Sequence, residues 1–214
     1  MFADAWTYLL AHPAQFWRAL GVHMALSASA LLLSALVSIP AGIAVARRHR
    51  LSLAVVNTAN IARTLPSLAV LALVMPLLGT GFAPALFALT LIALPPIVTH
   101  TIVAMRGVDA DVVDAAVGMG MTRSLLFWQI ELPLAMPVIF SGLRTAAVQV
   151  ISGAVLAAFI GGGGLGDFIT AGIAMMATAQ LLVGAIPVAL LALGADFLFG
   201  ALQRRITPQG LGST

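Results

Sequence analysis

The chain has 214 residues, of which 61% are hydrophobic and only 8% are charged, and its mean hydropathy is +1.10. About a quarter of the residues in soluble domains are charged, so this composition excludes an ordinary soluble protein and predicts an all-α, polytopic membrane protein. The formal net charge is +3, and all ten basic residues are arginine. These arginines are dispersed at the edges of apolar segments, so we expect no nucleic-acid binding. Cysteine is absent, which excludes disulfides and thiolate sites.

Residues 1–18 do not resemble a secretory signal, because Asp4 stands where such a signal requires positive charge. Aromatic residues at helical spacing predict an interfacial helix in this segment. No formal charge follows from Ala19 to Ala46, which is long enough for a tilted span of the lipid layer, about 30 Å thick. Arginines 47, 48 and 50 come directly after this first span. The positive-inside rule therefore predicts that the N-terminus lies outside.

Four further spans are predicted from the apolar pattern. The second begins in a mixed segment, Leu51 to Arg63, and becomes uniformly apolar only from Leu65 to Leu78, so its cytoplasmic half is expected to be polar. The third, fourth and fifth are predicted at about residues 85–105, 137–160 and 175–202. A kink is expected at Pro95-Pro96.

Five spans with the N-terminus outside bring the C-terminus inside. Outer turns are predicted at 79–81 and 161–167, and both are rich in glycine. We expect one transmembrane domain over residues 19–205, followed by a short cytoplasmic tail over 206–214. Inner-side arginines support this orientation: they are Arg47, Arg48, Arg50, Arg106, Arg123, Arg204 and Arg205, against Arg18 outside.

Residues 106–133, here called the surface loop, form the only long interruption of the apolar pattern. Asp111 can cap a short helix that ends about two turns later at glycine. A second helix is predicted from Thr122 to Glu131, where Leu132-Pro133 should break it before the fourth span. The loop is therefore expected to be a helix-turn-helix on the membrane surface.

The surface loop resembles that of permease subunits of bacterial ATP-binding-cassette importers. Their pattern is Glu-Ala-Ala, three residues, Gly, nine residues, Ile, one residue and Leu-Pro; this chain departs from it only by Asp114 in place of Glu. Two alanines and a glycine leave a nearly side-chain-free surface that the groove of another protein can approach. The residues expected to couple to an ATPase subunit are Asp114, Ala115, Ala116, Gly118, Gly120, Ile130, Leu132 and Pro133.

Residues 20–205 resemble the permease subunits of osmoprotectant importers, which carry glycine betaine, choline, carnitine or proline betaine. The resemblance rests on segments such as Arg63–Leu68, Gly142–Ala146 and Ile160–Ile169. It implies a five-helix, type I (MetI-like) permease in the bacterial inner membrane, working as a permease dimer with two cytosolic ATPase subunits and an extracytoplasmic binding protein. Methionine and taurine permeases share the loop, so a solute of that kind is the alternative.

The resemblance also implies that this chain is a transport subunit and not an enzyme. It has no lysine and no phosphate-binding loop, so ATP with Mg²⁺ is expected on the ATPase subunits and no cofactor in this chain. Its phenylalanines are scattered over different spans and form no box of aromatic faces for a quaternary ammonium. Selectivity is therefore expected to reside mainly in the binding protein.

Polar residues inside spans are costly and are candidates for function. Arg63 and Arg144 both lie toward the inner ends of spans. Their side chains could equally extend to the lipid headgroups without any functional role. Asp196 can pair with an arginine, which the sequence does not identify. The candidate pathway or gate residues are Arg63, Thr64, Ser67, Gln149, Ser152, Gly161, Gly163, Gly166 and Asp167.

The glycine-rich turn also resembles two other sequence patterns. Gly161, Gly163 and Gly166 fit a dinucleotide fingerprint, but they follow a membrane helix where a strand is required. The run ending at Asp167 is similar to the Gly-x-Gly-Asp signature of intramembrane aspartyl proteases, for which Asp196 is the only second carboxylate. The four histidines do not converge at ligand spacing, so no metal is predicted.

Overall fold

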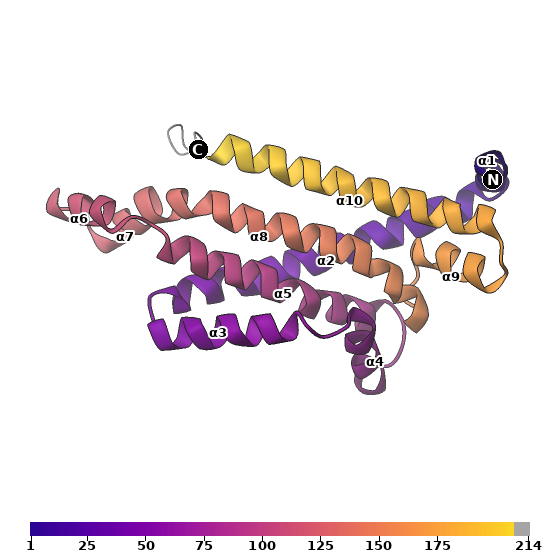
Figure 1. The fold of residues 1–214 in the computed structure, drawn as a ribbon, viewed down its shortest axis with the longest axis horizontal. Coiled ribbons are helices and arrows are strands. Elements are labelled where there is room, and N and C mark those ends of the chain that lie inside the picture. Colours follow the sequence, from indigo (N-terminus) through magenta and orange to yellow (C-terminus); the bar gives the residue numbers. More distant parts are fainter. Residues whose placement is uncertain (208–214) are drawn as a thin grey trace.

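Four long apolar helices run side by side along the molecule in the computed structural model, which describes residues 1–207 (Figure 1). Each is long enough to cross a lipid layer about 30 Å thick, and no strand occurs among the described residues. The predicted tail at 206–214 lies almost entirely outside the described residues. The four helices are α2 (Pro13–Ala46), α5 (Phe82–Arg106), α8 (Leu132–Gly153) and α10 (Thr178–Ile206).

The predicted second span is not one straight helix. It consists of α3 (His49–Ala62) and α4 (Ser67–Leu78), which meet at 95°. Pro66 precedes α4, and proline has no backbone N–H and disfavours helical geometry in the residue before it. The hydroxyl and the backbone N–H of Thr64 both donate to the carbonyl of Ile61, at 2.7 and 3.0 Å, and close the end of α3. The segment that was expected to cross the membrane as the second span is thus bent in its middle.

The helix ends that carry arginine lie together at one end of the molecule (Figure 1). The C-termini of α2, α5 and α10 lie there with α6 (Ala110–Gly118) and α7 (Arg123–Leu126), whereas α9 (Gly166–Ala174) lies at the other end. The seven arginines predicted for the inner side therefore share one end, as the positive-inside rule requires.

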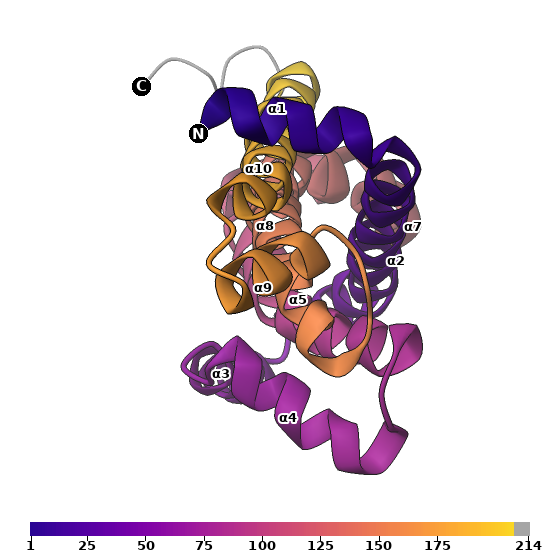
Figure 2. The same cartoon turned by 90° about the vertical axis from the view of Figure 1, so that its right-hand side faces the viewer.

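The predicted interfacial segment 1–18 is divided at His12. Its first part forms α1 (Phe2–Ala11), which lies across α10 (Figure 2), and Pro13 begins α2. Tyr8 of α1 packs edge-on against Phe168 of α9, with ring centroids 6.4 Å apart. Phe2 and Trp6 are exposed, so α1 presents one face to the helices and aromatic side chains outward.

Close packing of the helices depends on small residues. A Cβ on Gly42 of α2 would lie 2.8 Å from the side chain of Thr101 in α5. Nearby, Ser34 of α2 donates a hydrogen bond to the carbonyl of Thr90 at 2.9 Å. Lipid supplies little hydrophobic force between helices, so close approach and interhelical hydrogen bonds hold them together. The main buried cluster includes Leu26, Ala30, Ala85, Ala88, Leu89, Ala93, Ala146, Val150, Ala154 and Ala157.

Candidate functional site

The N-cap of α6, the first helix of the surface loop, lies two residues earlier than predicted. Its N-cap is Asp109, whose carboxylate accepts a hydrogen bond from the backbone N–H of Asp111 at 2.9 Å. The prediction that Asp111 is the cap was wrong, because Asp109 has the non-helical backbone geometry that a cap requires and Asp111 already lies in the first turn of the helix. Gly120 ends this turn with a φ of +83°, in the left-handed region that favours glycine.

The exposed face of α6 combines small and apolar side chains. Asp114 and Ala115 are exposed, whereas Ala116 is buried against the rest of the loop. Val117 and Met119, on either side of Gly118, are 54% and 77% exposed. The end of the helix therefore carries apolar surface that no described part of this chain covers.

The predicted break at Leu132-Pro133 was wrong. Thr122 caps α7 as expected, but the chain then makes a π-helical turn, Phe127–Glu131, and continues directly into α8. The backbone N–H of Leu132 bonds to the carbonyl of Phe127, five residues back. This wider turn accommodates Pro133, which has no N–H to donate and would obstruct a tighter one. The loop is consequently continuous with the fourth span.

The π turn is also tied to the end of α2. Glu131 is buried, and its carboxylate forms an ion pair with Arg47, the residue that ends α2. Ile130 and Leu132 are partly buried on either side of Glu131, whereas Pro133 is exposed. The residues predicted for coupling therefore divide into an exposed tip on α6 and a base packed against the spans.

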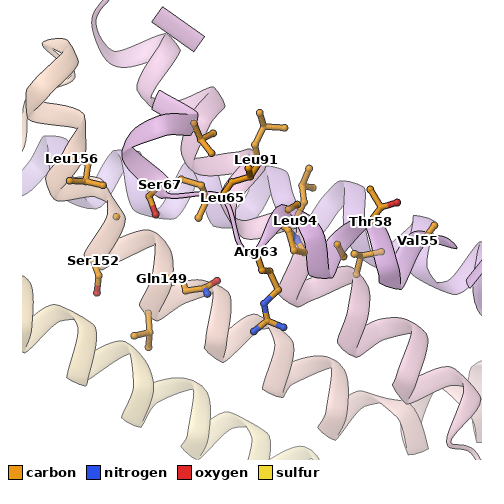
Figure 3. Close-up of a pocket in the computed structure, with 18 of the residues that line it drawn as sticks. Val55, Thr58, Arg63, Leu65, Ser67, Leu91, Leu94, Gln149, Ser152 and Leu156 are labelled. Atoms are coloured by element: carbon orange, nitrogen blue, oxygen red, sulfur yellow. The ribbon is translucent and has the colours of Figure 1, made fainter. Parts of the chain in front are cut away.

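A cavity of about 1170 Å³ lies between the spans, and we call it the central cavity. Residues of α3, α4, α5, α8 and the short helix η2 (Ala154–Ile160) form its wall, together with the break between α3 and α4. Four predicted pathway residues meet in it: Arg63, Ser67, Gln149 and Ser152 (Figure 3). Thr64 does not line it, because its hydroxyl is directed back to α3. Irregular backbone at membrane depth is tolerated where it lines such a cavity.

The glycine-rich turn lines a second, smaller cavity of about 420 Å³. Gly161 and Gly163 lie in its wall with φ of +72° and +75°, and Arg18 and Asp167 also line it. Partial burial raises the pKa of the Asp167 carboxyl above its ordinary value. Gly166 does not line this cavity; instead it packs against the chain, since a Cβ there would lie 2.2 Å from the carbonyl oxygen of Val155.

Asp196 is held by Arg144, the partner that sequence reasoning did not identify. Two hydrogen bonds, of 2.5 and 2.6 Å, join the guanidinium of α8 to both carboxylate oxygens on α10. An aspartyl protease needs two carboxylates that share a proton, and Asp196 is instead bound to an arginine. This geometry contradicts the protease alternative.

The histidines make separate contacts. His23 lies 3.0 Å from the carbonyl of Ile151, and His100 lies 2.7 Å from that of Pro96. Within residues 1–207 no group of three or more histidine or acidic side chains is placed to hold a metal ion.

A multi-pass helical chain with a polar-walled cavity between its spans and an exposed small-residue helix at one end has the architecture of a transport permease. Residues 38–208 match the family described as binding-protein-dependent transport system inner membrane component, and the chain belongs to this family. The permease prediction is thereby confirmed, and the chain is a transport subunit of an ABC importer and not an enzyme.

Three relatives have similar length and share more than a third of their residues with this chain. The carnitine transport permease protein OpuCB of Listeria monocytogenes is 42% identical over 189 residues, 88% of this chain and 87% of the relative. The glycine betaine/carnitine/choline transport system permease protein OpuCB of Bacillus subtilis is 38% identical over 205 residues, 96% and 94%. The osmoprotectant import permease protein OsmW of Salmonella typhimurium is 37% identical over 198 residues, 88% and 90%.

A solved structure of the MetNI methionine ABC transporter in inward-facing conformations has the same fold. Its matching chain superposes with a TM-score of 0.79 and covers 92% of this chain and 99% of its own length, at 19% identity. The all-α, MetI-like permease fold is therefore confirmed. Identity this low carries no statement about the solute.

Proposed function

We propose that this chain is the membrane-spanning subunit of an importer that carries a small osmoprotectant, such as glycine betaine, carnitine or choline, across the bacterial inner membrane. The observation that carries the proposal is the convergence of Arg63, Gln149 and Ser152 on one large cavity between the spans. The names of the relatives, at 37–42% identity, favour these solutes over methionine or taurine.

A second permease subunit is part of the proposal. Arg63 and Ser152 are exposed although they lie in the wall of the central cavity, so this chain alone leaves a charged side chain uncovered among its spans. A charge at membrane depth is costly without protein or water around it. A twofold partner that brings the same surface would enclose the cavity.

The exposed end of α6 supports the other partners. Val117 and Met119 offer apolar surface beside Gly118, which suits the groove of a cytosolic ATPase subunit that holds ATP with Mg²⁺. Two such subunits, one for each permease, would drive transport, and an extracytoplasmic binding protein would deliver the solute to the opposite end.

The test is uptake by the complete complex, with its ATPase subunits and binding protein, in proteoliposomes. We expect ATP-dependent uptake of labelled glycine betaine or carnitine that exceeds uptake of methionine and taurine. Uptake of methionine or taurine without any osmoprotectant would overturn the proposal.

A further inference from the structure

Arg63 differs from the arginines whose partners lie within the chain. Arg47 pairs with Glu131, Arg144 pairs with Asp196, and Arg106 donates to the hydroxyl of Ser52. Arg63 has no ion pair or side-chain hydrogen bond among the described residues. It stands at the break between α3 and α4, and Figure 3 shows its guanidinium extended from the break in the direction of α8. The central cavity therefore contains a guanidinium free to bind an anionic group.

The groups around Arg63 favour the same sign of charge. Ser67 begins α4, and the first N–H groups of a helix have no partner within it and carry partial positive charge. Half-helices that begin inside a membrane protein commonly direct this end at an anionic group of the solute. Across the cavity, Gln149 lies in the wall, and its side-chain NH2 group, which makes no hydrogen bond among the described residues, can donate to an anionic group.

The remainder of the wall offers nothing to attract a cation. The lining contains no aspartate, no glutamate and no aromatic ring. Cation–π contact and ion pairing are the two usual ways to hold a quaternary ammonium, and both are absent from this wall. Aliphatic side chains such as Val70, Leu91 and Leu156 occupy most of it, and they suit methyl groups.

We propose that the central cavity is a solute site that recognises a carboxylate, with Arg63 as its charge partner and with Ser67 and Gln149 as hydrogen-bonding groups. Glycine betaine and carnitine carry a carboxylate, and choline does not. The permease itself then distinguishes zwitterions from a plain cation, which goes beyond selection by a binding protein. The identity of the solute rests on the proposed function, but the preference for a carboxylate rests on the cavity alone.

The direct test is protection of Arg63 from phenylglyoxal, which modifies arginine, in the complete complex in lipid nanodiscs, with peptide mass spectrometry as the readout. Glycine betaine is expected to slow modification of Arg63, whereas choline at the same concentration is not. Arg50, exposed on the same helix α3, is the internal control and should react equally with either solute. Equal protection by choline, or modification of Arg63 that no zwitterion slows, would overturn the proposal.

Uptake by two variants gives the second readout. Arg63→Gln should lower uptake of glycine betaine relative to choline by about tenfold, the loss expected for one charged hydrogen-bonding partner. Arg63→Lys keeps the charge and should recover part of this ratio. An equal fall for both solutes in Arg63→Gln would mean a structural role and would contradict the site.

The two proposals fail in different ways. If the wild-type complex imports no osmoprotectant but a different zwitterion, such as methionine, protects Arg63, the proposed function fails and the carboxylate site stands. If glycine betaine is imported and no zwitterion protects Arg63, the site fails and the function stands.

Discussion

Gly166 allows close packing of α9 against η2 because it has no side chain. Its own backbone φ is not in the left-handed region, so the constraint is space: a Cβ there would lie 2.2 Å from the carbonyl oxygen of Val155, which belongs to backbone and cannot rotate away. Gly161 and Gly163 in the same turn are constrained differently, by positive φ. The sequence shows only that all three positions are glycine, and it could not separate backbone conformation from packing as the reason.

We expect Gly166→Ala to destabilise the protein by about 1–3 kcal/mol or more, because the backbone must move to admit one methyl group. Gly194→Ala is the matched control, since nothing lies within 4 Å of its added Cβ in the helix α10. That control should be neutral or gain up to about 1 kcal/mol from helix propensity. Thermal unfolding of the two variants in detergent provides the comparison, and equal midpoints would contradict the packing role of Gly166.

The pair of Arg144 and Asp196 gives a second prediction at this scale. Either single change to alanine leaves one charge between α8 and α10 without its partner, so both single variants should unfold at lower temperature than the wild type. The double change to alanine should be less harmful than the sum of the two. Additive losses in this double-mutant cycle would show that the two side chains do not stabilise one another.

At the scale of elements, breaks and continuities were harder to predict than the elements themselves. Pro66 and Pro133 are both prolines beside apolar segments, yet the chain bends by 95° at the first and stays helical through the second. A π turn absorbs Pro133, and no sequence pattern marks such a turn in advance. The helix α9 was also not predicted from the sequence, because its nine residues are too few to give a clear periodic signal.

The ion pair between Arg47 and Glu131 connects α2 to the π turn at the base of the surface loop. Glu131→Ala should loosen this connection, so that ATP hydrolysis continues while less solute is imported per ATP. Arg48→Ala is the matched control, because Arg48 is the neighbouring exposed arginine and makes no ion pair among the described residues. The exchange Arg47→Glu with Glu131→Arg should recover part of the coupling. An unchanged ratio of uptake to hydrolysis in Glu131→Ala would contradict this role.

For the whole molecule, spacing along the chain was sufficient for the class of protein but not for the site. The permease pattern in the surface loop and the apolar segments are local properties of the sequence. They predicted a permease with a MetI-like fold, which the family match and the fold confirm. The cavity is not local: Arg63 and Gln149 are far apart in sequence, and the bend before α4 helps bring them to the same cavity. Arg144 and Asp196 lie 52 residues apart, which explains why their pairing was left open.

The last prediction concerns transmission from the loop to the spans. If the end of α6 seats in an ATPase groove, then closure of the two ATPase subunits must push on α6, and the continuous path through α7 and the π turn carries the push into α8. Gly120 lies at the end of α6 with φ of +83° and with nothing within 4 Å of an added Cβ. A Cβ at Gly120 therefore meets no other described part of this chain, but a side chain there would meet a partner seated on the loop.

Two substitutions separate backbone strain from loss of the partner. Asparagine tolerates positive φ, so Gly120→Asn should fold normally, whereas Gly120→Glu adds strain of about 1–2 kcal/mol as well as a charge that a groove would bury. We expect both variants to insert in the membrane, and we expect both to lose ATPase subunits or coupled uptake, with Gly120→Glu the more severe. The measurements are ATPase stoichiometry in the purified complex and solute imported per ATP. Full stoichiometry with wild-type coupling in Gly120→Glu would contradict seating at this point, since burying an unpaired charge at the contact must weaken binding of the ATPase subunit.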